Sequence, residues 1–192
     1  MLRLRSRSRR VAKPRIKGAT IRTPMVSPSH HTNHAKAVLA HDPKQVDQLL
    51  EKGESINDRV RPTKGARAGF TPLILAASMS AAEMTEFLLQ RGAKVTDVDD
   101  YHRSAFWYAA LNQSVGVATV LSKAPGAKDV INEPDGDFKR TPLHVAVHGT
   151  SPEMVKLLLE AGASLDQRDV LEETPNEFCK RRPTEACTVL RR

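Results

Sequence analysis

One short motif recurs four times in the chain at a nearly constant spacing, and this recurrence restricts the fold more than any other feature. The motif is clearest as TPLHVAV, which begins at Thr141. It returns as TPLILAA from Thr71, as SAFWYAA from Ser104 and as TPNEFCK from Thr174. The four starts are 33, 37 and 33 residues apart, so the third repeat is four residues longer than its neighbours. A fixed period in this range is typical of a solenoid, in which neighbouring repeats bury each other's apolar faces.

Each repeat has the signals of two short helices. Thr141 suits a helix N-cap because its hydroxyl can accept a backbone N–H, and Pro142 follows where a missing N–H costs nothing. Ser151 starts a second helix, and Gly162 suits the left-handed residue that ends it. Helices of about two or three turns are not stable alone in water. The sequence therefore predicts helix pairs that need neighbouring pairs for their stability.

A further unit precedes the first complete motif. Asp42-Pro43 starts a helix that ends at Gly53, without the TPL sequence in front of it. The last repeat replaces apolar residues by charged ones, as expected of a terminal cap. We therefore expect an all-α solenoid of about five helix-hairpin repeats over residues 32–192, with degenerate first and last repeats. Residues 1–31 are expected to form a basic N-terminal extension that is disordered or is ordered by a partner.

These units resemble ankyrin repeats over roughly residues 32–192. The residues that match the family pattern best are Thr141, Pro142, Leu143, His144, Ala146, Leu157, Leu158, Gly162 and Ala163. The resemblance implies turns that project sideways from the paired helices, a concave face, and a role in binding other proteins. It also implies that His144 is a structural residue.

By this resemblance, partner contacts come from the projecting turns and from the exposed side of the first helices. The residues at those positions are Arg67, Phe70, Met79, Tyr101, Arg103, Leu111, Asn112, Phe138, Arg140 and His148. Aromatic and arginine side chains carry much of the binding energy of protein interfaces. Because Arg67, Arg103 and Arg140 recur once per repeat, we expect a ladder that faces an acidic segment. The alternative is that these side chains only cover neighbouring turns.

Several residues are expected to be structural. Trp107 is expected to pack between repeats, with its indole N–H hydrogen-bonded nearby. Cys179 and Cys187 occupy small-residue positions and are interpreted as reduced core residues of an intracellular protein.

A group of histidines comprises His30, His31, His34 and His41. Since no cysteine or carboxylate completes a ligand set there, we predict no metal site.

The positive charge of the chain is confined to its N-terminal part. The net charge is +8, yet no aspartate or glutamate precedes Asp42, whereas ten basic residues do. The remaining 20 basic and 22 acidic residues leave the repeats near −2. The residues predicted to anchor the extension to an acidic surface are Arg3, Arg5, Arg7, Arg9, Arg10, Lys13, Arg15, Lys17 and Arg22.

Four hypotheses remain for this extension. It has too few large apolar residues for a core, so the first hypothesis is a solvated tail without specific use. An arginine- and serine-rich segment without acids is also typical of a mitochondrial presequence. An anchor on an acidic protein surface such as tubulin is the third hypothesis. Nucleic acid is the fourth, and RNA is less favoured because the extension has no aromatic residue to stack on bases.

The chain lacks the common sequence signatures of catalysis. It contains no GxxxxGK, HExxH or GxSxG motif, and no apolar run long enough to span a membrane. We predict a non-enzymatic scaffold or adaptor without cofactor or metal, monomeric outside its complex. It is expected to bind a protein on its concave face and an acidic surface through its extension. The alternative is an integral component of a microtubule-based or ribonucleoprotein assembly. A cytoplasmic or cytoskeletal location is expected, with mitochondrial and nuclear locations as alternatives.

Overall fold

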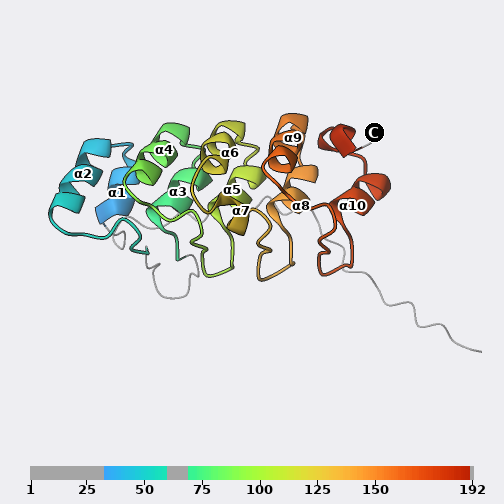
Figure 1. The fold of residues 1–192 in the computed structure, drawn as a ribbon, viewed down its shortest axis with the longest axis horizontal. Coiled ribbons are helices and arrows are strands. Elements are labelled where there is room, and N and C mark those ends of the chain that lie inside the picture. The colour runs from blue at the N-terminus through green and yellow to red at the C-terminus, as the bar shows by residue number, and fades with distance from the viewer. Residues whose placement is uncertain (1–32, 60–68, 191–192) are drawn as a thin grey trace, which may run out of the picture.

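A computed structural model of the chain describes residues 33–59 and 69–190 (Figure 1). Arg67 and the nine basic residues assigned to the anchor lie outside these ranges. Within them the chain forms a row of five helix pairs, which confirms the predicted all-α solenoid. No helix in these ranges is long and apolar enough to cross a membrane.

The helices form two parallel rows (Figure 1). The first helices of the repeats are α1 (Asn33–Leu39), α3 (Pro72–Ser78), α5 (Ala105–Leu111), α8 (Pro142–Val147) and α10 (Pro175–Arg181). The second helices are α2 (Pro43–Glu51), α4 (Ala82–Gln90), α6 (Val115–Ser122), α9 (Pro152–Glu160) and the 3-10 helix η2 (Ala186–Leu190). A short helix α7 (Ala127–Val130) follows α6 and lies within the longer third repeat.

The predicted helix starts are confirmed. Thr71, Ser104, Thr141 and Thr174 each cap a first helix by accepting a backbone N–H of its first turn. Asp42 caps α2 in the same way, by accepting the N–H of Gln45 at 3.1 Å. These caps act within one helical turn, so they need no information from distant parts of the chain.

The core lies between the two rows of helices. Phe106, Leu73, Leu88, Leu121 and Leu158 are among the largest side chains that are fully buried. The first helices contact one another in chain order, and so do α4, α6, α9 and η2 among the second helices. Each repeat therefore stabilises the next one, as a solenoid requires.

Trp107 belongs to this core, as expected. It is 3 % exposed, and its ring meets the edge of Tyr108 with the ring centroids 5.3 Å apart. The expectation for its indole N–H was wrong, because Nε1 has no hydrogen-bond partner among the described residues.

The expectation of two reduced cysteines was also wrong. Cys179 in α10 and Cys187 in η2 form a disulfide, with their Cα atoms 5.4 Å apart. Both residues are buried, at 3 % and 0 % exposed. The turn that joins α10 to η2 folds the chain back on itself, and this brings together two cysteines that a local reading of the sequence treats separately.

Two histidines of the N-terminal group, His34 and His41, belong to the described residues, and they differ in burial. His34 is fully buried in α1, with Nδ1 3.7 Å from Oε2 of Glu54, and burial lowers the pKa of His34. His41 is exposed in the turn between α1 and α2. In residues 33–59 and 69–190, no three histidine, cysteine or acidic side chains form a group suited to a metal ion. His30 and His31 lie outside those ranges.

Candidate partner-binding surface

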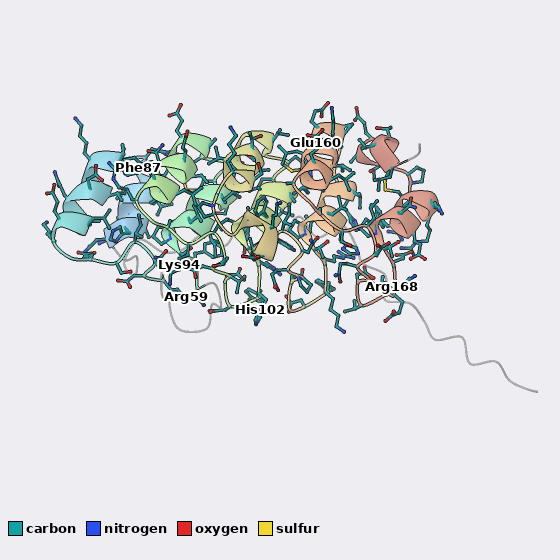
Figure 2. The ribbon with its side chains drawn as sticks, in the orientation of Figure 1. Arg59, Phe87, Lys94, His102, Glu160 and Arg168 are labelled. Carbon is teal, nitrogen blue, oxygen red and sulfur yellow. A yellow bond between two sulfur atoms is a disulfide. The ribbon has the colours of Figure 1, made fainter. Side chains whose placement is uncertain are left out.

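Three loops project from the same side of the helix pairs, and we call them fingers. Finger 3 (94–104), finger 4 (131–141) and finger 5 (164–174) lead into repeats three, four and five. Figure 1 shows them side by side below the helices, and Figure 2 places Lys94, His102 and Arg168 along this edge. The loop that leads into repeat two is only partly described.

A buried aspartate organises each finger. Asp99, Asp135 and Asp169 are 2 %, 2 % and 5 % exposed. In each case Oδ1 accepts two backbone N–H groups of the same finger at 2.8 to 3.2 Å. These residues were not among the predicted site residues, although an aspartate five or six residues before Ser104, Thr141 and Thr174 was a detectable signal. The carboxylates hold the fingers in one conformation.

Backbone hydrogen bonds join the fingers to one another. The N–H of Gly136 donates to the carbonyl of Tyr101 at 2.8 Å, and the N–H of Val170 donates to the carbonyl of Phe138 at 3.0 Å. The fingers are therefore stacked in register. Tyr101, Phe138 and Leu171 take equivalent positions, each three residues before the cap of the following helix.

Apolar side chains are exposed at the ends of fingers 4 and 5. Phe138, Val170 and Leu171 are 42 %, 45 % and 45 % exposed, and we call these three residues the apolar tip. Among the described residues, Leu39 and Leu165 are the other large apolar side chains that are similarly exposed. The apolar tip is thus where exposed apolar area gathers on adjacent, hydrogen-bonded loops.

The two described members of the predicted arginine ladder, Arg103 and Arg140, are not free. The guanidinium of Arg103 lies 4.6 Å from the ring centroids of both Tyr101 and Trp107, and its Nη2 donates to Oδ2 of Asp137 at 3.2 Å. The Arg103 side chain is only 14 % exposed.

Arg140 repeats this arrangement one finger further along. Its guanidinium lies 5.2 Å from the Phe138 ring centroid, and its Nε is 3.6 Å from Oδ2 of Asp169. The Arg140 side chain is 20 % exposed. An aspartate of the next finger neutralises each of the two arginines, so the expectation that they face an acidic segment is corrected. The alternative, that they cover neighbouring turns, fits their geometry.

Phe70 is a second correction among the predicted contact residues. It is 3 % exposed, and its ring lies edge-on to Tyr108 with the centroids 5.2 Å apart. It is therefore a core residue, because the chain's own rings cover it.

The other predicted residues lie at the C-terminal ends of the first helices. Met79 and Leu111 are half-buried, and Asn112 is exposed. The Asn112 side chain donates to the carbonyl of Ser78 at 2.8 Å, which links repeats two and three. Their contact with a partner stays a prediction.

His148 is exposed, yet its ring stacks on Phe178 with the centroids 3.8 Å apart. Loss of hydration on the stacked face, followed by the nearby positive charge of Arg140, lowers the pKa of His148 to about 4. His148 is therefore neutral near pH 7 and offers no positive charge to a partner.

His144 has the structural role that was expected. Its Nδ1 accepts the backbone N–H of Thr141 at 3.2 Å, so Nε2 carries the proton and donates to the carbonyl of Glu173 at 3.1 Å. The imidazole thus joins repeat four to finger 5. Burial lowers the pKa of His144, which keeps this neutral form at pH 7.

Five stacked helix pairs with projecting fingers define a helical repeat solenoid. A family model for three copies of the ankyrin repeat matches residues 34–133, and a model for one further ankyrin repeat matches residues 138–170. The chain belongs to the ankyrin repeat family. Ankyrin repeats are generally modules for protein–protein interaction, so the fold implies protein partners.

Several curated proteins share this repeat region. Neurogenic locus notch homolog protein 1 of Xenopus tropicalis is 34 % identical over 110 residues, which is 57 % of this chain and 4 % of that protein. The mitochondrial disaggregase of Bos taurus is 28 % identical over 146 residues, covering 76 % of this chain and 20 % of the relative. Transient receptor potential cation channel subfamily A member 1 of Homo sapiens is 27 % identical over 152 residues, 78 % of this chain and 13 % of the channel. The chain therefore spans a small part of each relative.

Proposed function

We propose that this chain is a non-catalytic scaffold or adaptor that binds a protein partner through its fingers and the adjacent ends of its first helices. The observation that carries this proposal is the apolar tip, where three exposed apolar side chains lie on adjacent loops. Exposed apolar side chains that gather on a surface mark interaction sites in soluble proteins. The buried aspartates hold the fingers in place before binding, which lowers the entropic cost of forming a complex.

Residues of finger 3 and of the first helices extend this surface. Tyr101 lies in register with Phe138 and is half-buried. Met79, Leu111, Asn112 and His148 lie on the ends of the first helices and are at least partly exposed. We propose that these residues line the concave side of the contact, whereas Phe70 does not take part.

Replacing Tyr101 and Phe138 together by alanine is expected to abolish partner binding with a small effect on stability. Each ring supports one arginine, and such a contact contributes about 0.5–1 kcal/mol. The thermal midpoint should therefore fall by only a few degrees. The measurement is quantitative mass spectrometry of proteins that copurify with the tagged full-length chain.

Phe87→Ala is a matched control, because the guanidinium of Arg91 lies 4.4 Å from the Phe87 ring centroid in the same way, but Phe87 belongs to α4 in the row of second helices. The proposal predicts that this control keeps every partner. Unchanged copurification with the double variant contradicts the proposal, and a large loss of helix content assigns the two rings to the core instead.

The N-terminal extension supplies a second contact in this proposal. Its basic residues are proposed to bind an acidic protein surface such as tubulin, with RNA as the less favoured partner. Two modest contacts on one chain raise each other's effective concentration, so together they bind more tightly than either alone. Permanent incorporation into a microtubule-based or ribonucleoprotein assembly is the alternative, and the proposed location is cytoplasmic or cytoskeletal. A mitochondrial location is the second candidate, since one relative is named a mitochondrial disaggregase.

Deletion of residues 1–29 is expected to leave the repeats folded and to abolish cosedimentation with polymerised tubulin. Exposed charges act over about 8–10 Å at physiological salt, so binding of the intact chain should weaken as salt is raised. Circular dichroism checks the fold of the deletion variant. Equal cosedimentation of the two chains contradicts the anchor. An endogenous protein whose N-terminus begins near residue 20 or 30 supports the presequence instead.

A further inference from the structure

The fingers are acidic, although the chain as a whole is basic. Fingers 3, 4 and 5 together contain ten acidic and five basic residues, and finger 5 has four acidic residues and one arginine. The net charge of the three fingers is therefore −5, against +8 for the chain. Three of the ten acidic residues, Asp99, Asp135 and Asp169, are buried. Among the exposed charged residues of the fingers the acidic ones still outnumber the basic ones, five to three.

Ion pairs within the chain neutralise charges of both signs in the fingers. Arg103 and Arg140 each lie against an aspartate of the next finger, and Arg168 pairs with Glu177 at 2.9 Å. These three arginines account for much of the positive charge of the fingers. In contrast, the carboxylates of Asp166 and Glu172 in finger 5 are exposed and form no ion pair within the described ranges.

Exposed carboxylates and exposed apolar side chains therefore meet on finger 5. Glu172 directly follows Val170 and Leu171 in the chain, and the Val170 N–H is bonded to the carbonyl of Phe138. Lys139, next to Phe138, is exposed and is a local exception to the negative charge. Charged side chains of any partner segment that covers the tip therefore lie close to Glu172.

We propose that the apolar tip binds a protein segment whose apolar side chains are flanked by lysine or arginine. This inference rests on the proposed function and specifies its partner. Apolar side chains of the segment bury Phe138, Val170 and Leu171, while its basic side chains lie near Glu172 and Asp166. An acidic segment is disfavoured, because like charges brought together at an interface reduce affinity and suppress wrong partners.

Three labelled peptides of about twelve residues test this proposal against the full-length chain by fluorescence anisotropy. One alternates leucine and lysine, one alternates leucine and glutamate, and one alternates serine and lysine. Removing two apolar contacts is expected to weaken binding at least about tenfold. We expect this loss for the leucine–lysine peptide in the variant Phe138→Ser/Leu171→Ser. Leu39→Ser is the matched control and should bind as the wild type does.

The other peptides separate charge from apolar contact. The N-terminal extension is basic and can attract the leucine–glutamate peptide, but that binding should be the same in the wild type and in Phe138→Ser/Leu171→Ser. The serine–lysine peptide should bind weakly to every chain. Glu172→Lys is expected to weaken binding of the leucine–lysine peptide several-fold.

Each opposite result overturns a defined part of the proposal. If the tip substitutions reduce binding of the leucine–glutamate peptide instead, the charge of the partner is wrong and the interaction role stands. If no peptide responds to the tip substitutions, the apolar tip is not a docking surface. The proposed function is then judged separately, by the copurification experiment with Tyr101 and Phe138.

Discussion

Replacing Asp99 by alanine is expected to destabilise repeat three by about 3–5 kcal/mol, the largest effect of any polar substitution in the fingers. Oδ1 of Asp99 accepts the backbone N–H groups of Tyr101 and Arg103, each at 2.8 Å. Its Oδ2 accepts the hydroxyl of Tyr108, also at 2.8 Å. The alanine variant leaves these three donors without their acceptor, and the Tyr108 hydroxyl belongs to a side chain that is only 2 % exposed. Chemical denaturation and hydrogen exchange of residues 94–111 measure the loss.

Two neighbouring substitutions calibrate this prediction. Tyr108→Phe removes one of the three hydrogen bonds, so it should destabilise the repeat less than Asp99→Ala. Burial and the adjacent carboxylate raise the pKa of Tyr108, so its hydroxyl remains a donor at neutral pH. Asp97→Ala changes a half-buried aspartate of the same finger and should have little effect. Equal stability of Asp97→Ala and Asp99→Ala contradicts the role assigned to Asp99.

Reduction of the Cys179–Cys187 disulfide is expected to destabilise repeat five by about 2–3 kcal/mol, because the unfolded segment gains conformational freedom. The bond joins α10 to η2, and η2 also packs against α9. Because solenoid repeats contact mainly their neighbours, the effect should stay local. Hydrogen exchange should accelerate in residues 174–190 upon reduction and change little in residues 72–122.

The variant Cys179→Ala/Cys187→Ala is the control for this experiment. It should exchange rapidly in residues 174–190 both with and without reductant, since it has no bond to reduce. If reductant leaves the wild-type chain unchanged, the disulfide does not hold the last repeat. If reductant also alters the double variant, the effect of the reductant lies elsewhere in the chain.

The positions of the finger residues were predictable in part. The spacing from the helix caps placed Tyr101 and Phe138 at the projecting turns, and the structure has them there. The same spacing placed Phe70 among the contact residues, yet Phe70 is buried against Tyr108. Phe70, Arg103 and Arg140 share the position directly before the cap, and their side chains are largely covered, whereas Phe138, three residues before its cap, is 42 % exposed. Whether a ring is covered depends on which side chain the neighbouring repeat places over it.

Charge was less predictable than position. The recurrence of Arg103 and Arg140 was visible in the sequence, but their partners Asp137 and Asp169 lie on the following finger. These ion pairs join residues 34 and 29 positions apart, respectively, in the chain. Only the stacking of the fingers brings the members of each pair within reach. The excess of acidic residues in the fingers is visible in the sequence, but the stacking decides which of the charges are paired.

The amino-acid sequence alone determined the repeat period, the helix pairs and their caps, because these depend on interactions within one or two helical turns. Thr141 and Pro142 mark the start of α8 through contacts within its first turn. Only the tertiary structure decided that Phe138 faces outward and Phe70 inward, that the arginines are neutralised, and that Cys179 meets Cys187. Each of these outcomes depends on distances between segments that approach one another only when the repeats stack.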